Sequence, residues 1–292
     1  NKEHNFIMSM SKKAFIFVLP FLLVLCGCSA RDIKADSFYI ALQGINIDRL
    51  SKLNYDLIII DYSYDGSEAG EIKSEEVNKL KENGKKVFSY LSIGEAEDYR
   101  FYWKDSFKEN PPSWILNENP NWPGNYTVAF WDEGWQKIVF EYIDKVVKAG
   151  FDGIFLDRVD VYREFLDEDS SKDYQKLMID FLRKIIKNLN DKNITSFKII
   201  LNNAEDLPLK DYVLFRNICG LVAESLYTDG AGNIRSEEEI KVREKPLSRL
   251  KRAGKCVMII EYSVSEGKQL ILKERAEKKK FLIQFLNPSL SL

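Results

Sequence analysis

The segment Gly150–Asp160, with the sequence Gly-Phe-Asp-Gly-Ile-Phe-Leu-Asp-Arg-Val-Asp, decides the fold of this chain. A helical pattern ends at Gly150, and the apolar run 154–156 follows and stops abruptly at Asp157. A short apolar run that follows a helix and is flanked by glycine is typical of a buried parallel strand. A carboxylate at the carboxyl end of such a strand stands where α/β barrels and open α/β sheets place their chemistry.

The same alternation of apolar runs and helical segments extends outward in both directions from residue 38 to the end of the chain. We expect strands at 38–42, 57–60, 87–93, 154–157, 198–201, 221–223, 256–260 and 281–285. Helices are expected at 47–53, 75–83, 135–149, 174–189, 209–217, 237–252 and 265–280, with Pro246 kinking or splitting the sixth of these. Eight strands with helices between them predict a single-domain (β/α)8 TIM barrel over residues 38–292. An open doubly wound sheet is the alternative, but no glycine-rich phosphate loop follows the first strand.

Residues 98–132 interrupt this rhythm. The segment contains four prolines and reads as a long excursion, and all five tryptophans fall in it or beside it. Long loops in compact domains are usually functional or disordered, and this one is too aromatic for disorder. The tryptophans could form platforms for sugar rings, and we expect two or three of them simply to pack the excursion onto the barrel.

Composition excludes several classes of function. The net charge is −2 and the pI is about 5.8, so nothing in the charge favours a nucleic-acid partner. The single histidine, His4, lies before the expected translation start at Met8 or Met10. Ser-His-Asp and Cys-His catalysis and His-ligated zinc are therefore not expected. Acid–base chemistry would have to use carboxylates, Tyr, Lys or Cys.

The first 28 residues read as an export signal. Lys12 and Lys13 precede a short apolar core, 14–25, and Leu-Cys-Gly-Cys then resembles a lipobox with Cys28 as the lipidated residue. An ordinary signal peptide or a membrane anchor is the alternative, although the apolar run is short for a span. We expect an exported lipoprotein of the bacterial envelope or surface, with residues 29–37 as a tether.

Two further cysteines, Cys219 and Cys256, each precede an apolar run. We expect both in the core as free thiols, although an exported protein would permit a disulfide between them.

Five of the expected strands end in a carboxylate, and in a barrel all five would face one mouth. They are Asp61, Glu95, Asp157, Glu224 and Glu261. Clustered carboxylates raise one another's pKa, so such a cluster usually binds a cation or carries out acid–base chemistry. Carboxylate oxygens suit Mg²⁺ or Ca²⁺, but no calcium-loop spacing is present. Glycoside hydrolysis needs two carboxyl groups and no histidine.

A series of motifs in a fixed order carries a specific resemblance over residues 38–288. The motifs are Leu-Ile-Ile-Ile-Asp-Tyr at 57–62, Tyr-Leu-Ser-Ile-Gly-Glu-Ala-Glu-Asp-Tyr-Arg at 90–100, Asn-Pro-Asn-Trp-Pro-Gly-Asn-Tyr at 119–126, Phe-Trp-Asp at 130–132 and the segment 150–160. The set resembles glycoside hydrolase family 114, the endo-α-1,4-polygalactosaminidase-like barrels.

The resemblance implies a (β/α)8 glycosidase that cleaves α-1,4-linked galactosamine-containing polysaccharide without a cofactor or metal. It places the catalytic carboxylates at Asp157 and Glu224. We expect Glu224 as general acid and Asp157 as nucleophile or base, and the distance between the two carboxyl groups would separate retention from inversion. The expected substrate-binding residues are Asp61, Glu95, Trp131, Asp160, Asn203 and Tyr262. The partners expected are the polysaccharide and, through the lipid alone, the membrane, with the protein itself a monomer.

Two other functions fit the same residues. A surface glycan-binding barrel without catalysis would keep the aromatic excursion but would not need both Asp157 and Glu224. A metal-dependent hydrolase or lyase would use the same carboxylates and would lose activity in chelator.

Overall fold

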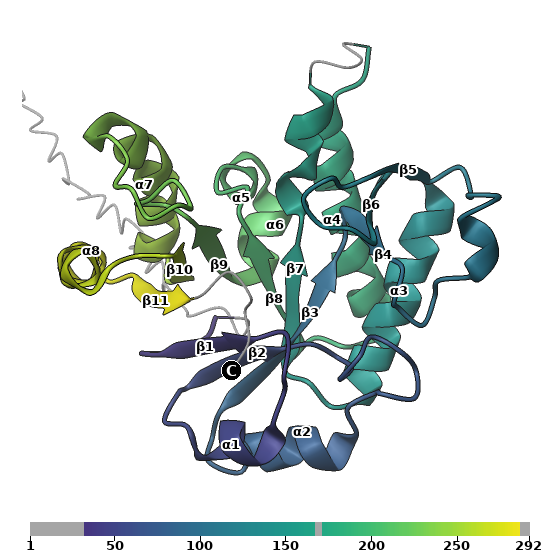
Figure 1. The fold of residues 1–292 in the computed structure, drawn as a ribbon, viewed down its shortest axis with the longest axis horizontal. Coiled ribbons are helices and arrows are strands. Elements are labelled where there is room, and N and C mark those ends of the chain that lie inside the picture. The colour runs from purple at the N-terminus through teal and green to yellow at the C-terminus, as the bar shows by residue number, and fades with distance from the viewer. Residues whose placement is uncertain (1–31, 167–170, 287–292) are drawn as a thin grey trace, which may run out of the picture.

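The computed structural model describes residues 32–166 and 171–286. Its main sheet contains eight parallel strands in the order β1-β2-β3-β7-β8-β9-β10-β11 (Figure 1). Their bounds are β1 Phe38–Ala41, β2 Leu57–Ile60, β3 Lys86–Ser92, β7 Gly153–Asp157, β8 Lys198–Asn202, β9 Ile218–Glu224, β10 Cys256–Tyr262 and β11 Leu282–Leu286. The first and last strands adjoin, since the Ile40 backbone N–H donates to Gln284 Oε1 at 3.3 Å. The prediction of a (β/α)8 barrel is confirmed.

Helices connect successive strands and cover the outside of the barrel. They are α1 Ile47–Lys52, α2 Ser74–Lys81, α3 Glu133–Lys148, α4 Tyr174–Asp191, α5 Leu207–Lys210, α6 Tyr212–Asn217, α7 Glu237–Arg252 and α8 Glu266–Lys278, with 3₁₀ turns at Asp105–Phe107 and Val159–Phe165. Pro246 does not split α7, which runs unbroken from its Ser236 cap. The carbonyl that loses its helical partner belongs to Val242, a 68% exposed residue where water can replace the bond.

The excursion after β3 is not the irregular loop that we expected. Together with the three residues just before it, this segment forms a three-stranded antiparallel sheet in the order β4-β6-β5, which lies beside α3 (Figure 1). The strands are β4 Glu95–Glu97, β5 Ile115–Glu118 and β6 Asn125–Val128. Strands of three or four residues are too short to give an alternating pattern, so the sequence carried no periodic signal for them.

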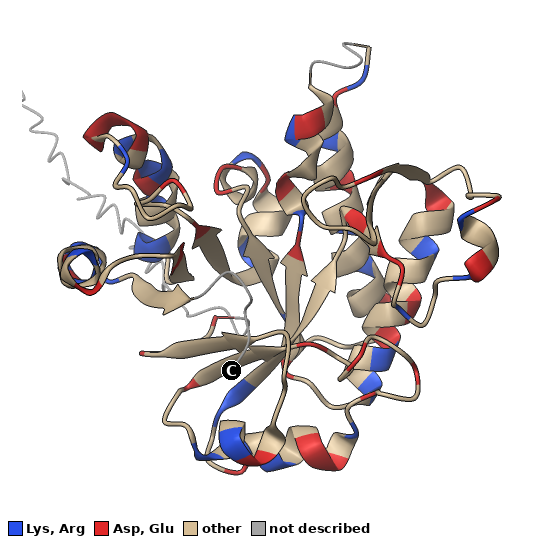
Figure 2. Cartoon of the chain, in the orientation of Figure 1, with Lys and Arg blue, Asp and Glu red and all other residues tan. Residues whose placement is uncertain are grey.

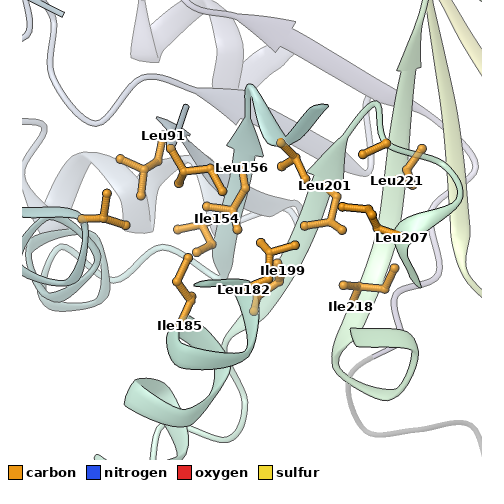
Figure 3. Packing of buried hydrophobic residues seen from close by; sticks show 14 of the residues in the cluster. Leu91, Ile154, Leu156, Leu182, Ile185, Ile199, Leu201, Leu207, Ile218 and Leu221 are labelled. Atoms are coloured by element: carbon orange, nitrogen blue, oxygen red, sulfur yellow. The ribbon is translucent and has the colours of Figure 1, made fainter. Parts of the chain in front are cut away.

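Apolar residues pack in two layers, one inside the barrel and one between the strands and the helices. Strand β2 illustrates the two-residue period, because Leu57 and Ile59 join the inner cluster whereas Ile58 and Ile60 join the outer one. Figure 3 shows part of the outer layer, where Leu182 and Ile185 of α4 pack against Ile154 of β7. The strands carry little charge along their length, and Lys, Arg, Asp and Glu lie mainly on helices and loops (Figure 2).

Cys219 and Cys256 are buried and free, as expected, and both belong to the inner cluster. Part of the expected tether also packs against the barrel. Ile33 is 7% exposed and joins the inner cluster, and Asp32 pairs with Lys255 at 2.7 Å. The expected signal segment 1–28 and Cys28 lie outside the described residues. Among the described helices, none has the length and apolar character needed to cross a membrane.

Candidate active site

Four neighbouring strands each end in a polar side chain at the same rim of the barrel. Asp157 ends β7, Asn202 ends β8, Glu224 ends β9 and Tyr262 ends β10. The next residue has a positive φ in every case, at Arg158 (57°), Asn203 (52°), Ser225 (47°) and Ser263 (56°). A left-handed conformation costs a residue with a side chain about 1 kcal/mol or more. Strain of this kind concentrates at functional sites, and here it recurs at four adjacent strand ends.

Asn202 joins the two proposed catalytic carboxylates. Its Nδ2 donates to Asp157 Oδ1 at 2.7 Å and to Glu224 Oε1 at 3.0 Å. The two N–H bonds of an amide diverge by about 120°, so linear hydrogen bonds of these lengths would place the two oxygens about 5 Å apart. The arrangement is a matched pair of carboxylates on either side of β8.

Asp157 accepts two further hydrogen bonds. Tyr90 Oη donates to Oδ2 at 3.0 Å, and the Arg158 backbone N–H donates to Oδ1 at 2.7 Å. With Asn202, three donors therefore face this carboxyl group. Such an environment suits an ionised carboxylate, which only accepts hydrogen bonds.

Glu224 has a different environment. Burial, and then the negative charge of Asp157, raise the pKa of Glu224 to about 7. Tyr262 hydrogen-bonds to its carboxylate and, like Asn202, offsets part of this rise in pKa. The backbone around Glu224 is fixed, because its N–H donates to Asn203 Oδ1 at 3.1 Å and its carbonyl accepts from Arg243 of α7 at 3.0 Å. Glu224 can therefore carry a proton near neutral pH beside a charged partner.

Asp160 lies in the 3₁₀ turn after β7, near both carboxylates. Burial raises the pKa of Asp160, and the charge of Asp157 adds to the rise while Arg158 opposes it. Its charge in turn contributes to the raised pKa of Glu224. The fold thus brings three of the predicted substrate-binding residues, Asp160, Asn203 and Tyr262, close to Asp157 and Glu224.

Asp61 and Glu95 lie at the same rim, but each is buried in an ion pair. Asp61 Oδ1 lies 2.7 Å from Arg100, which also pairs with Glu97 at 2.5 Å. Glu95 lies 3.0 Å from Arg158 Nε and accepts from Asn119 Nδ2 at 2.8 Å. We expected Glu95 at the end of the third barrel strand. Instead, β3 ends at Ser92 and Glu95 is the first residue of β4. Asp61 and Glu95 therefore lie at the expected rim, but their carboxylates are paired with Arg100 and Arg158.

Glu261, the fifth strand-end carboxylate, holds the loop after β9. It accepts from the backbone N–H groups of Tyr227 at 2.6 Å and Thr228 at 3.1 Å, and it is fully buried. Burial raises the pKa of Glu261, and these hydrogen bonds act in the opposite direction.

Trp131 is not among the strand-end polar residues. It packs in an aromatic cluster, with ring centroids 5.2 Å from Phe165 and 5.1 Å from Tyr174. Trp114 and Trp135 are buried, and Trp103 stacks on Tyr126 at 4.8 Å. Four of the five tryptophans therefore pack against the protein, more than we expected, and Trp122 is the exposed one.

Comparison with models of protein families identifies the family of this chain. The model of glycoside-hydrolase family GH114 matches residues 28–287. The chain belongs to this family. Its relatives include uncharacterized protein MJ1477 of Methanocaldococcus jannaschii, 40% identical over 85% of this chain and 71% of that protein. An uncharacterized Thermotoga maritima protein is 34% identical over 89% of this chain and 82% of its own length.

Solved structures agree on the fold of this GH114 protein. The glycoside hydrolase domain of PelA from Pseudomonas aeruginosa gives a TM-score of 0.68 at 16% identity, covering 89% of this chain and 97% of that one. Aspergillus fumigatus Ega3, solved in complex with galactosamine, gives 0.66 at 19% identity, covering 87% and 92%. The reaction class that goes with the family is glycoside hydrolysis, which a pair of carboxylates can carry out without other groups.

Three groups in this GH114 site escaped the sequence analysis. Asn202 directly follows the expected strand 198–201 and was not predicted as a site residue, although its position next to Asn203 at a strand end was a signal. Tyr90 and Arg100 gave no separate signal, because the residues that they contact, Asp157 and Asp61, are far from them in the sequence. Within residues 32–166 and 171–286, no group of three or more His, Cys, Asp or Glu side chains is arranged to hold a metal ion.

Proposed function

We propose that this protein is a glycosidase that cleaves α-1,4-linked galactosamine-containing polysaccharide, with Asp157 and Glu224 as its two catalytic carboxylates. The observation that carries the proposal is their shared donor, Asn202, with bonds of 2.7 and 3.0 Å. Carboxyl groups about 5–5.5 Å apart fit a retaining mechanism, and inversion needs about 6.5–9.5 Å to admit water. The separation of about 5 Å favours retention.

In this mechanism Asp157 attacks the anomeric carbon while the glycosidic C–O bond breaks. Glu224 gives its proton to the leaving oxygen and becomes a carboxylate. In the second step Glu224 takes a proton from water, whose oxygen attacks the anomeric carbon and releases Asp157. The pKa of Glu224 near 7 suits a group that must first hold a proton and then accept one.

The proposed substrate is supported by two further observations. A cationic amino sugar suits a rim with several carboxylates, and Ega3, which shares this fold, was solved with galactosamine bound. We propose Asp160 and Tyr262 as residues that contact the sugar, because they lie beside the carboxylate pair. Asn203 would act by holding Glu224. Asp61, Glu95 and Trp131 would support the walls of the site without contacting the sugar, since their side chains already contact other residues of the protein.

Export and lipidation at Cys28 remain part of the proposal, supported by the charged start, apolar core and lipobox in the sequence. They place a monomeric enzyme at the envelope or surface, where it would meet an exopolysaccharide. Incorporation of labelled palmitate into wild type but not into Cys28→Ser tests this point. Equal labelling of the two proteins would contradict it.

The decisive experiment for the substrate uses the soluble fragment that starts at Arg31. It compares release of reducing ends from partly deacetylated α-1,4-galactosamine polymer, its fully acetylated form and a glucosamine polymer, with and without chelator. Faster cleavage of the first polymer, unaffected by chelator, supports the proposal. Loss of activity in chelator would favour a metal-dependent hydrolase, and binding without cleavage would favour a glycan-binding protein.

A further inference from the structure

A cavity of about 640 Å³ lies beside the carboxylate pair and is separate from it. One wall is formed by the end of β5 and the turn that follows it, residues 116–122, and the other wall contains Arg158, Glu164 and Phe165. A hollow of this size can hold about a disaccharide, since small-molecule sites measure about 300–1,000 Å³.

The cavity is built onto the proposed catalytic centre. Arg158 follows Asp157 directly, donates its backbone N–H to Asp157 at 2.7 Å and lines the cavity with its side chain. On the other wall, Asn119 donates to Glu95 at 2.8 Å, and Glu95 lies 3.0 Å from Arg158. Because Arg158, the residue after Asp157, lines the cavity, a polysaccharide bound at Asp157 would also reach the cavity.

The β5–β6 turn presents its tryptophan to solvent. Trp122 is 55% exposed, unlike the other four tryptophans, which pack against the protein. The turn is ordered by its own bonds, with Trp122 N–H donating to the Asn119 carbonyl at 3.1 Å and Gly124 N–H to Glu118 Oε1 at 2.8 Å. A sugar ring that stacks on an indole carried by such a turn does not have to order the backbone of the turn as well.

The charges of the cavity suit a cation. Glu118 and Glu164 both line it, and its cation, Arg158, is already paired with Glu164 at 2.6 Å and with Glu95. Excess negative charge beside an exposed indole attracts an ammonium group, because the ring face also binds cations. A neutral or acetylated sugar would gain only the stacking.

We propose that this cavity is a binding subsite for cationic amino-sugar units of the polysaccharide, next to the bond that is cleaved, with Trp122 as the platform and Glu118 as a charge-reading residue. The inference rests on the proposed glycosidase function and adds to it a site outside the carboxylate pair. It explains why one tryptophan of the excursion stays exposed.

The test compares Trp122→Ala with the control Tyr212→Ala on α-1,4-galactosamine oligomers of increasing length. Tyr212 is 74% exposed and does not line the cavity. For long oligomers, Trp122→Ala should raise KM about fivefold to tenfold with little change in kcat, and the shortest oligomer cleaved should be unaffected. Glu118→Gln keeps the acceptor for Gly124 and should reduce the preference for deacetylated over acetylated oligomers.

A KM for Trp122→Ala equal to that of wild type at all lengths would overturn the subsite, and so would an equal loss at all lengths. Neither result would affect the proposed hydrolysis. If wild type cleaves no oligomer, the proposed function fails instead, and affinity electrophoresis in the same deacetylated polymer then tests the subsite alone. Weaker retardation of Trp122→Ala than of Tyr212→Ala would support it, and equal retardation would contradict it.

Discussion

Asp157 and Glu224, on either side of strand β8, accept hydrogen bonds from one nitrogen, Asn202 Nδ2, at 2.7 and 3.0 Å. A single amide thus sets the distance between the two carboxyl groups and also favours the charged form of Glu224.

Replacing Asn202 by Ala should lower kcat by about 10–100-fold, because the two carboxylates lose the group that orients them. The same change removes a hydrogen bond that lowers the pKa of Glu224, so this pKa should rise. The alkaline limb of the pH profile of kcat/KM should therefore move above its wild-type position near pH 7. A profile measured between pH 5 and 9 checks this, and an unchanged limb would show that Asn202 does not act on Glu224.

Tyr90→Phe should lower kcat about tenfold with little change in KM, because Asp157 loses the Tyr90 donor at 3.0 Å. Tyr99→Phe is the matched control, since Tyr99 Oη donates to Glu97 Oε1 at 2.9 Å, an oxygen that also lies 3.3 Å from Tyr90 Oη. Steady-state kinetics of the two variants separate positioning of Asp157 from general damage to the network. Equal losses in both variants would rule out a specific role for Tyr90.

Glu224→Gln should stabilise the protein at high pH. The pKa of Glu224 is about 7 in the folded state and near 4.5 when unfolded, so the folded state binds the proton more tightly. The ionised carboxylate therefore costs stability as pH rises from about 4.5 towards 7 and above. Tm should rise by about 2–5 °C at pH 8 and change little at pH 4. A lower Tm at pH 8 would show that Glu224 is not a destabilising charge in the folded protein.

The configuration of the first product should match that of the substrate. If the two carboxyl groups are about 5 Å apart, as their bonds to Asn202 Nδ2 indicate, no water fits between Asp157 and the anomeric carbon, and the reaction should pass through a covalent intermediate. Proton NMR of the first minutes of hydrolysis should detect the α-anomer before mutarotation. Initial appearance of the β-anomer would indicate inversion and a wider separation in the substrate complex.

Periodicity was enough to predict the barrel strands, because each buried run is bounded by glycine or by a polar residue such as Asp157. It did not predict the β4-β5-β6 sheet, whose short strands depend on pairing between distant segments. The strand-end positions of Asp157, Glu224 and Tyr262 followed from the fold. The engagement of Asp61 by Arg100 and of Glu95 by Arg158 did not, because ion pairs between separate loops leave no local pattern.

The most direct test of the central claim measures hydrolysis of deacetylated α-1,4-galactosamine polymer by wild type, Asp157→Asn and Glu224→Gln, with circular dichroism to establish folding. Both substitutions keep the shape of the side chain and remove its charge or its proton. We predict that each folded variant loses activity by about a thousandfold or more. A folded variant of either kind that retains activity near that of wild type would contradict the assignment of Asp157 and Glu224 as the catalytic pair.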